Sequence, residues 1–242
     1  MDELLFEGMI SLRALIESRS RPIHTVLYAR ERVEKYPKEY AFLTHRAAEG
    51  LFAIQLLPKS EIDARATGKT HGGVLALCGA RAPLPLPAGL PEAGFFTLME
   101  GVEDPYNFGY ALRALYAAGA DGVILTHART GADGTICRAS AGASERLPLY
   151  VAPPEESVEA FRRAGYKIVC ADQPNSIPVY DADLKKPLLL VVGGEKRGIS
   201  RPVLERADAI VRLVYGRAFP EALSAASAAS ILAFEVLRQN LK

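Results

Sequence analysis

The chain has 242 residues, 49% of them hydrophobic and 24% charged, with 29 Lys and Arg against 28 Asp and Glu and a formal net charge of +1. This length and composition exclude a disordered chain, a collagen-like repeat and a small disulfide scaffold, and they suffice for one large or two smaller domains with cores of their own. The near-zero charge argues against indiscriminate binding to polyanions, although a local basic patch is compatible with it.

The cysteines and the termini bear on the compartment. Cys78, Cys137 and Cys170 lie far apart in apolar segments, which predicts neither a zinc site nor a disulfide framework but three buried thiols of a cytosolic protein. No stretch reaches the roughly 18 apolar residues of a membrane span, and the chain opens on acidic residues 2 and 3 instead of a basic signal head. We therefore expect a cytoplasmic protein with no metal and no membrane anchor.

A proline-rich segment divides the chain. Residues 81–94 contain four prolines and two glycines, a composition that favours extended backbone and excludes a helix. We interpret it as the linker between a domain of residues 1–80 and a domain of residues 95–242. The first domain is predicted to be a small α/β domain, with helices at 4–18 and 37–48 and strands at 23–28, 51–57 and 73–78.

The second domain alternates strands and helices. Strands are predicted at 95–100, 122–125, 167–171, 188–192 and 209–214, and helices at 107–118, 156–164 and 221–241. Continuous Val, Ile and Leu strands between amphipathic helices predict a parallel sheet covered on both faces. Because ligands of such sheets bind at the carboxyl ends of strands, we expect the chemistry in the loops after residues 100, 192 and 213.

The first of these loops turns at residues 104–105 and enters a helix that Asn107 can cap, with Arg113 nearly two turns further on. From this segment alone, a capped helix with a solvated arginine is as good an interpretation as a site. The loop after residue 192 is rich in glycine, which permits positive φ and brings main-chain groups close to a ligand. It matches neither a Walker loop nor a dinucleotide fingerprint. Glu195, placed among basic residues in this loop, favours a functional turn over a purely structural one.

The third loop, residues 215–221, leads into a helix whose first half, residues 222–230, is almost all Ala and Ser. In order and spacing, the three segments resemble the signature motifs of the SpoU (TrmH-type) family of RNA 2′-O-ribose methyltransferases, in the SPOUT class. Residues 139–148 and 71–76, with Gly8, also resemble family segments, so the resemblance covers nearly the whole chain. The motif residues are Asn107 and Arg113, then Gly193, Glu195, Gly198 and Ser200, and more loosely Leu223, Ala228, Ala229, Ile231 and Glu235.

The resemblance implies a fold and a cofactor. The fold is a small N-terminal α/β substrate-recognition domain followed by a parallel-sheet α/β domain with a trefoil knot, which general connection rules would not predict. S-adenosylmethionine would be held at Gly193, Leu213 and Leu223. Family members are homodimers, which would give a partner to the larger apolar residues of the last helix; the alternative is that this face packs on its own sheet. Those residues are Leu223, Ile231, Phe234, Leu237 and Leu241.

The resemblance also implies a reaction, the transfer of a methyl group to a ribose 2′-hydroxyl of structured rRNA or tRNA. Arg113 would pair with the adjoining phosphate and stabilise the developing alkoxide, because free arginine is too basic to act as a general base at neutral pH. The alternative is that Arg113 activates the hydroxyl after a deprotonation assisted by that phosphate. Asn107 would orient the arginine or the ribose, and Glu195 would hold the loop or the arginine. Ser224 stands where many members have an asparagine, so either it replaces that residue or catalysis is weakened.

Two alternatives remain at this stage. A catalytically weakened homologue that binds RNA during ribosome assembly would keep the scaffold and lack transfer. A small-molecule α/β enzyme would need a nucleophile elbow or a nucleotide fingerprint, and the sequence has neither. RNA recognition is expected from Arg13, Arg19 and Arg21 near the end of the first helix, since arginines beside a turn can grip phosphates. A solvated helix terminus explains these arginines equally well.

Overall fold

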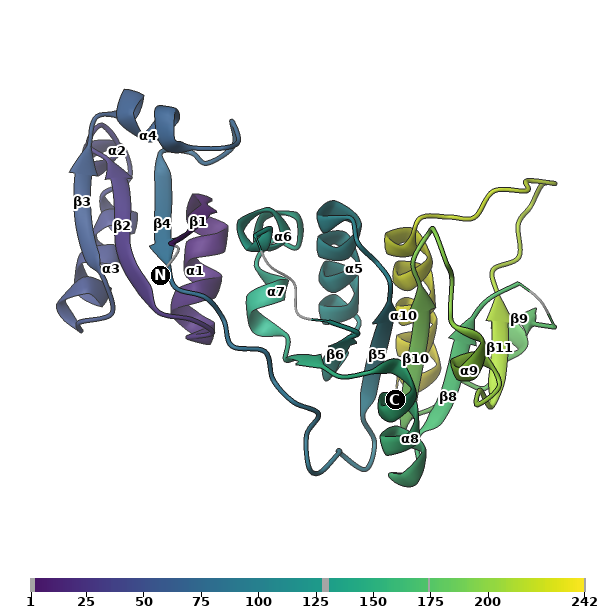
Figure 1. Cartoon of the computed structure of the whole chain (residues 1–242). Coiled ribbons are helices and arrows are strands. Elements are labelled where there is room, and N and C mark those ends of the chain that lie inside the picture. The colour runs from purple at the N-terminus through teal and green to yellow at the C-terminus, as the bar shows by residue number, and fades with distance from the viewer. Residues whose placement is uncertain (1–2, 128–130, 174, 242) are drawn as a thin grey trace. The chain divides into compact units, whose positions relative to one another are not determined.

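The computed structural model describes residues 3–127, 131–173 and 175–241 (Figure 1). The chain forms two compact units, one of Met1–Ala82 with Arg129–Arg146 and one of Pro83–Ala128 with Leu147–Lys242. The first boundary between the units, between Ala82 and Pro83, lies within the proline-rich segment. The division differs from the expected domains at residues 131–146, which we placed in the second domain and which belong to the first unit.

The first unit is built on a four-stranded mixed sheet in the order β1-β4-β2-β3. β4 lies antiparallel to both β1 and β2, and β3 lies parallel to β2. The helices α6 and α7 return from later in the chain and contact β1 and α1. The elements are β1 (Leu4–Glu7), α1 (Gly8–Ser18), β2 (Ile23–Ala29), α2 (Arg32–Lys35), α3 (Pro37–Ala48), β3 (Ala53–Leu57), α4 (Lys59–Arg65), β4 (Val74–Cys78), α6 (Asp133–Ala139) and α7 (Ala143–Arg146).

One predicted element of this unit is wrong. Residues 4–18 were expected to form a single helix, but the first four form β1, paired with β4 from Leu4 opposite Cys78 to Glu7 opposite Leu75. Gly8 then turns the chain at φ +83°, a conformation that residues with a Cβ adopt rarely, and α1 begins there. The pairing partner β4 lies some 70 residues away in sequence, so local periodicity could not reveal it.

The second unit is built on a seven-stranded sheet in the order β7-β6-β5-β10-β8-β11-β9, parallel throughout. A parallel sheet of this kind confirms the predicted α/β class. The elements are β5 (Phe95–Glu100), α5 (Pro105–Ala117), β6 (Gly122–Leu125), β7 (Leu149–Val151), α8 (Pro154–Arg163), β8 (Lys167–Ala171), β9 (Ile177–Pro178), η1 (Val179–Asp181), β10 (Leu188–Gly193), α9 (Arg201–Leu204), β11 (Ala209–Arg212) and α10 (Ala225–Asn240).

Alternate residues of the central strands feed two layers of core. On β5, Phe96 and Leu98 belong to a buried cluster with Phe161 of α8 and Val203 of α9. Successive side chains of a strand point to opposite faces, so the intervening residues, Thr97 among them, face the other layer. α5 and α10 lie side by side and α10 contacts β10 (Figure 1). Because both faces of the sheet are covered, consecutive side chains of the central strands are buried.

The last helix buries a different face from the expected one. Ala226, Ala229, Leu232 and Val236 are buried, whereas Phe234 of the predicted apolar face is 49% exposed. The interpretation that the larger apolar residues pack on the protein's own sheet is therefore wrong. The small residues make the contact instead, because a row of alanines lets α10 lie close to its neighbours.

The C-terminal end of α10 is fastened to the segment that precedes β10. Gln239 accepts a hydrogen bond from the Leu184 N–H at 2.9 Å and donates one to the Ala182 carbonyl at 3.0 Å. Asn240 accepts from the Lys186 N–H at 3.1 Å. Two amide side chains thus satisfy backbone groups that have no strand partner. The trefoil knot implied by the family resemblance stays a prediction.

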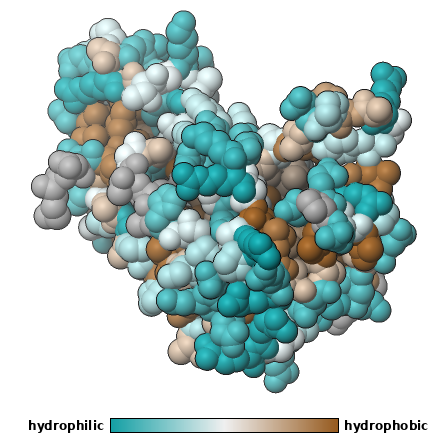
Figure 2. Space-filling model, turned by 45° about the vertical axis from the view of Figure 1, so that its right-hand side comes forward, coloured by the Kyte–Doolittle hydropathy of each residue, from teal (hydrophilic) through white to brown (hydrophobic). Residues whose placement is uncertain are grey.

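The three thiols are buried and free, as predicted. Burial raises the pKa of Cys78, Cys137 and Cys170 to about 12, so each remains a neutral thiol at physiological pH. In the part of the chain that the structure describes, no helix has the length and apolar character required to cross a membrane. Apolar surface nevertheless shows between polar patches (Figure 2). Among the described residues, the large exposed apolar side chains include Tyr106, Tyr110, Tyr116, Val214, Phe219, Ile231 and Phe234.

Candidate active site

The three predicted motifs meet at one carboxylate oxygen. The Asn107 side chain, on α5, donates a hydrogen bond from Nδ2 to Glu195 Oε1 at 2.8 Å. The main-chain N–H of Ala225, the first residue of α10, donates to the same oxygen at 3.2 Å. Glu195 lies in the loop after β10 and so joins α5 to the start of α10. Loops far apart in the sequence converge here, at the carboxyl edge of the sheet, as the strand order requires.

Asn107 is free to make this contact because it does not cap its helix. The cap is Asp104, whose carboxylate accepts a hydrogen bond from the Asn107 main-chain N–H at 2.7 Å. The expectation that Asn107 caps α5 is therefore wrong: Pro105 occupies the first position of the helix, where its missing N–H costs nothing. The Asn107 side chain consequently points toward the glycine loop and not toward its own backbone.

The glycines at the end of β10 and directly after it are required by the protein's own backbone. A Cβ on Gly193 would lie 2.4 Å from the carbonyl carbon of Gly198, and one on Gly194 would lie 2.0 Å from the carbonyl oxygen of Gly101. The Gly194 N–H also donates to the Glu100 carbonyl at 2.7 Å. The loop after β10 is thereby locked onto the loop after β5. The structural and the functional interpretations of this turn are compatible, because the close approach gives the loop a fixed shape.

A cavity of about 210 Å³ opens beside this loop, at the carboxyl ends of β8, β10 and β11. The three residues predicted to hold the cofactor, Gly193, Leu213 and Leu223, all line it. Ala225 and Ala228 of α10 form part of its wall. The run of small residues that begins the last helix therefore leaves room for the cavity as well as for helix packing.

Polar groups of the cavity include residues that sequence reasoning missed. Asp172 and Gln173 line it directly after β8, and Tyr215 lines it after β11. The Tyr215 hydroxyl accepts a hydrogen bond from the Leu223 N–H at 3.2 Å. The rule that ligands bind after parallel strands could have indicated Asp172, because residues 167–171 were predicted as a strand. The charged residues of the lining are the carboxylates of Asp172 and Glu195 and the guanidinium of Arg212.

Arg113 lies on the exposed side of α5. It is not among the residues that line the cavity, and no hydrogen bond or ion pair joins it to another residue of the described ranges. Six residues of helix separate it from Asn107, which corresponds to about 9 Å along the helix axis. Tyr106 and Tyr110 share its helical face and are about half exposed. Within one copy of the chain, the predicted catalytic arginine thus faces solvent.

Ser224 caps the last helix. Its Oγ accepts a hydrogen bond from the Ser227 N–H at 3.2 Å and lies 3.2 Å from the Ser227 hydroxyl. It sits between the cavity residues Leu223 and Ala225 without lining the cavity itself. The altered third motif therefore keeps a polar residue whose observed role is to fix the start of α10.

Of the three arginines expected to bind RNA, Arg21 is not available. Its side chain is 3% exposed and pairs with Glu145 at 3.0 Å and with Asp133 at 2.9 Å. Burial alone would lower the pKa of Arg21, but the two carboxylates outweigh it and raise the pKa above its usual range. The expectation that Arg21 grips a phosphate is therefore corrected: this guanidinium holds α6 and α7 in the first unit.

Arg13 and Arg19 remain on the surface. The Arg13 guanidinium lies 5.0 Å from the centre of the Phe42 ring, and that of Arg46 lies 5.6 Å from the same ring. Arg19 ends α1 in the left-handed conformation at φ 50°, with its N–H bonded to the Leu15 carbonyl at 3.0 Å. Arg13 therefore presents a cation from the middle of α1, with an aromatic ring beside it, and Arg19 presents one at the C-terminal end.

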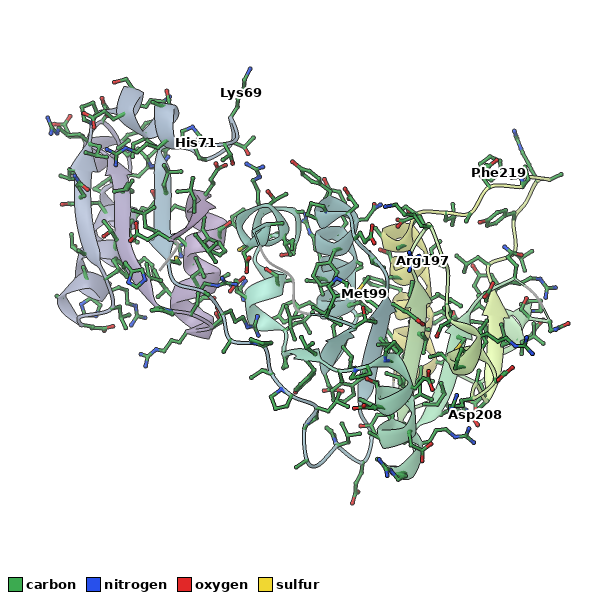
Figure 3. The ribbon with its side chains drawn as sticks, viewed as in Figure 1. Lys69, His71, Met99, Arg197, Asp208 and Phe219 are labelled. Atoms are coloured by element: carbon green, nitrogen blue, oxygen red, sulfur yellow. The ribbon has the colours of Figure 1, made fainter. Side chains whose placement is uncertain are left out.

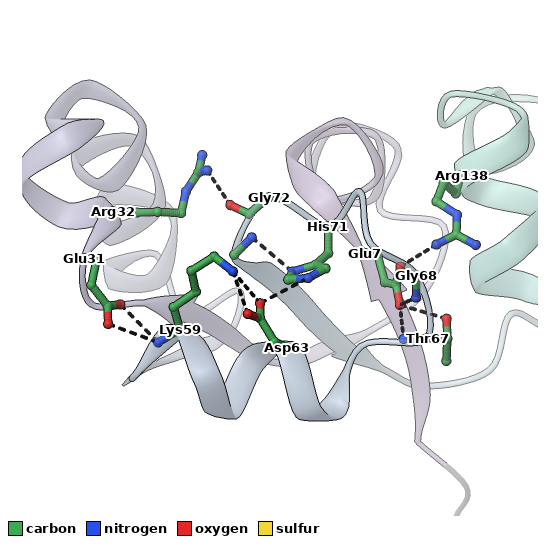
Figure 4. A network of polar contacts seen from close by, with 11 residues as sticks. Glu7, Glu31, Arg32, Lys59, Asp63, Thr67, Gly68, His71, Gly72 and Arg138 are labelled. Carbon is green, nitrogen blue, oxygen red and sulfur yellow. Dashed lines mark hydrogen bonds and ion pairs between the residues drawn. The ribbon is translucent and has the colours of Figure 1, made fainter.

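A second polar feature of the first unit is the loop of residues 66–73, which Glu7 holds in place (Figure 4). Glu7 accepts hydrogen bonds from the N–H groups of Thr67 at 2.5 Å and Gly68 at 3.1 Å, and it pairs with Arg138 at 2.5 Å. Burial raises the pKa of Glu7, but the bonds from Thr67 and Gly68 and the charge of Arg138 outweigh it, so the pKa is lowered overall. Lys69 projects at the tip of this loop (Figure 3).

His71 closes the turn that contains the two glycines after it. Its Nδ1 accepts a hydrogen bond from the Gly73 N–H at 3.1 Å, and its Nε2 lies 3.3 Å from Asp63. Gly72 and Gly73 both have positive φ, 59° and 79°, so the turn into β4 needs both. The histidine is buried and closes a turn, and over the residues that the structure describes no three His, Cys, Asp or Glu side chains are grouped to hold a metal ion.

Comparison with known proteins agrees with this arrangement. The model of the SpoU rRNA Methylase family matches residues 94–234. A protein of Staphylococcus haemolyticus assigned to the TrmH family of tRNA/rRNA methyltransferases is 28% identical, over 99% of this chain and 97% of that protein. The SpoU methyltransferase AviRb from Streptomyces viridochromogenes, crystallised with AdoMet, gives a TM-score of 0.80 at 25% identity, covering 98% of this chain and 90% of its own.

A crystal structure of an RNA 2′-O ribose methyltransferase has the same fold, with a TM-score of 0.78 at 23% identity over 98% of this chain and 88% of that one. The family match spans the three motifs that Glu195 brings together, from the start of β5 into α10. Geometry and comparison therefore lead to one conclusion. The chain belongs to the SpoU rRNA methylase family.

Proposed function

We propose that this protein transfers a methyl group to a ribose 2′-hydroxyl of a structured RNA, either rRNA or tRNA. The methyl donor is S-adenosylmethionine, the cofactor with which AviRb was crystallised. The observation that carries the proposal is the convergence of Asn107, Glu195 and Ala225 beside one cavity. The name of the Staphylococcus haemolyticus relative supports an RNA substrate, and the fold shared with a 2′-O ribose methyltransferase supports the 2′-hydroxyl as acceptor.

The residues of the cavity suit this cofactor. S-adenosylmethionine carries a cationic sulfonium and ammonium and an anionic carboxylate, and Asp172 and Arg212 bring one charge of each sign to the cavity. Leu213, Leu223 and Leu232 supply apolar surface for the adenine ring. When bound, the cofactor supplies a methyl group that is already activated. The chain's own residues must then orient the acceptor oxygen and stabilise the charge that develops on it.

Placement supplies most of the catalysis in this proposal. Holding two reactants in register can contribute roughly 7 to 11 kcal/mol. Arg113 acts as a fixed cation that pairs with the phosphate adjoining the target ribose and lowers the energy of the alkoxide. Its guanidinium is exposed and therefore accessible to RNA. Asn107 and Glu195 position the loops, and Ser224 fixes the first turn of α10.

A homodimer is part of the proposal. α5 and α10 pack side by side, and both leave large apolar side chains uncovered: Tyr110 is 51% exposed, Phe234 49% and Ile231 38%. Since the last helix does not bury these residues on its own sheet, a second copy of the chain is the partner that the family resemblance favours. Arg113 shares its helical face with Tyr106 and Tyr110, so such an interface would run beside the catalytic arginine.

The first unit would recognise the RNA. Arg13 and Arg19 offer exposed cations, and Lys69 adds a third on the loop held by Glu7. Phosphate contacts of this kind position an RNA without reading its sequence. A cytoplasmic location, where rRNA and tRNA are modified, belongs to the same proposal.

The experiment is tritium transfer from labelled S-adenosylmethionine to total RNA of a strain that lacks the protein, followed by digestion to nucleosides. The proposal predicts label in a 2′-O-methylated nucleoside at one mapped position of rRNA or tRNA. Label on a base would contradict the choice of acceptor. Cofactor binding without transfer to any RNA would favour the weakened homologue that binds RNA during ribosome assembly.

A further inference from the structure

The connection from β11 to α10 carries apolar side chains that the proposed reaction has not used. Val214 is 56% exposed and Phe219 is 55% exposed, and Arg217 between them is exposed as well. Figure 3 shows Phe219 on this connection, away from the strands of the sheet. Exposed apolar side chains that gather in one patch, as Val214, Tyr215 and Phe219 do here, are candidates for binding.

These residues line an open hollow of about 440 Å³. Its lining consists of Val214, Tyr215, Gly216, Arg217, Phe219 and Leu223. Tyr215 and Leu223 also line the cofactor cavity, so the two spaces share a wall. A molecule in the hollow would therefore lie next to the place where the methyl group is transferred.

The two rings of the hollow differ in freedom. The Tyr215 hydroxyl is held by the Leu223 N–H at 3.2 Å, which fixes that ring against the first turn of α10. The Phe219 ring lies 6.2 Å from it, centre to centre, with the planes inclined at 49°. The two rings are tilted and not stacked in parallel, and 55% of the Phe219 surface is exposed to solvent. The outer ring is thus available to a planar ligand while the inner one is anchored.

The chemistry of the hollow is that of a nucleotide site. A nucleobase stacks on an aromatic ring whatever its identity, and arginine pairs with the phosphate of the same strand. The loop also carries the exposed acid Glu221, which offsets the charge of Arg217. The stack on Phe219 must therefore contribute more than long-range attraction does.

We infer that Phe219 and Arg217 bind the nucleotide next to the methylated one, with its base stacked on Phe219 and its phosphate paired with Arg217. The inference rests on the proposed function, because it takes the substrate to be RNA. It adds a substrate subsite formed by the connection of residues 214–221, separate from the arginines of the first unit.

The test compares Phe219→Ala, Phe219→Trp and Arg217→Ala with the unaltered protein, on a transcript of the RNA region mapped by tritium transfer. Removing one base–aromatic stack costs about five- to a hundredfold in affinity. We expect Phe219→Ala to raise KM for the RNA by that factor, Phe219→Trp to restore it, and the Kd for S-adenosylmethionine to stay within twofold. Tyr180→Ala is the matched control, because Tyr180 is 58% exposed in the same unit and lies outside the hollow.

Three results would overturn the inference. The first is an unchanged KM for RNA in Phe219→Ala. The second is weakened binding of S-adenosylmethionine with RNA binding intact, which would make the connection a cover for the cofactor. The third is dissociation of a dimer by Phe219→Ala, which would assign the ring to a protein interface. Should the unaltered protein transfer no methyl group, the proposed function fails separately, and direct binding of the variants to rRNA and tRNA from the deficient strain still tests the subsite.

Discussion

Glu195 makes both of its hydrogen bonds through one oxygen, so mutation can separate the effect of these bonds from the effect of its negative charge. Oε1 accepts hydrogen bonds from both the Asn107 side-chain amide and the Ala225 main-chain N–H. Glu195→Ala removes both bonds, which at about 1 to 3 kcal/mol for unsatisfied groups corresponds to a loss of roughly 5- to 100-fold in methyl transfer. Glu195→Gln keeps an acceptor oxygen and should retain most of the activity. Initial rates and calorimetric binding of S-adenosylmethionine measure this; equal losses in both variants would show that the charge and not the bonds matters.

The arginines of the first unit divide into a structural one and exposed ones. Arg21→Met leaves the buried Glu145 without its cation and should lower the free energy of unfolding by about 3 to 5 kcal/mol. Arg13→Ala removes an exposed side chain and should change that free energy by no more than about 0.5 kcal/mol while raising KM for RNA. Urea denaturation followed by circular dichroism distinguishes them. A fully stable Arg21→Met protein with poor RNA binding would restore Arg21 to the RNA surface.

Glu7 gives the first unit a dependence on pH. Its pKa is lowered by folding from an ordinary value of 4.5, so the stability it contributes is present above pH 4.5 and is lost as the pH falls through the lowered pKa. The glutamine of Glu7→Gln is neutral throughout this pH range, so the variant lacks this contribution at every pH. We expect the variant to be less stable than the unaltered protein at pH 6, with the difference shrinking below pH 4.5, as urea unfolding at a series of pH values would show. A difference that is constant with pH would mean that the charge of Glu7 contributes nothing.

At the scale of elements, the sequence predicted what local pattern determines. The strands at 95–100, 122–125 and 167–171 agree with the structure at both ends, because each is a short apolar run that needs no distant information. β1 was missed because its pairing with β4 outweighs a helical pattern in residues 4–7. The four-residue helices α2, α7 and α9 were missed because one turn carries no periodicity.

The site shows the same limit. The family resemblance implied that Gly193, Leu213 and Leu223 hold one ligand, and the structure brings them to one cavity. The bond from Asn107 to Glu195 could not be predicted, because it depends on Asp104 taking the cap. In the last helix, the face with the larger apolar residues was identified, but only the packed structure shows that the alanines are inside. Sequence pattern therefore located the site, and tertiary contacts decided what each side chain does there.

At the scale of the whole molecule, the exposed faces of α5 and α10 predict association. Phe234→Asp places a charge on the uncovered side of α10 without disturbing the buried Leu232 and Val236. We expect this variant to sediment as a folded monomer at micromolar concentration while the unaltered protein sediments as a dimer. Tyr180→Asp, at an exposed position that belongs to neither α5 nor α10, should remain dimeric. An unaltered protein that is monomeric over the same range would contradict the proposed assembly.

The central claim is that the cavity binds the methyl donor and that Arg113, which lies outside the cavity, acts on the acceptor. Arg113 does not line the cavity of Gly193, Leu213 and Leu223, so removing its side chain should leave donor binding intact. The decisive measurement is therefore made on Arg113→Ala, with calorimetric titration of S-adenosylmethionine and tritium transfer to RNA in parallel. The account predicts a Kd within about threefold of the unaltered protein and a loss of transfer of at least about a hundredfold, a typical effect of removing one stabilising group at a developing oxyanion. Transfer retained within about tenfold would contradict it.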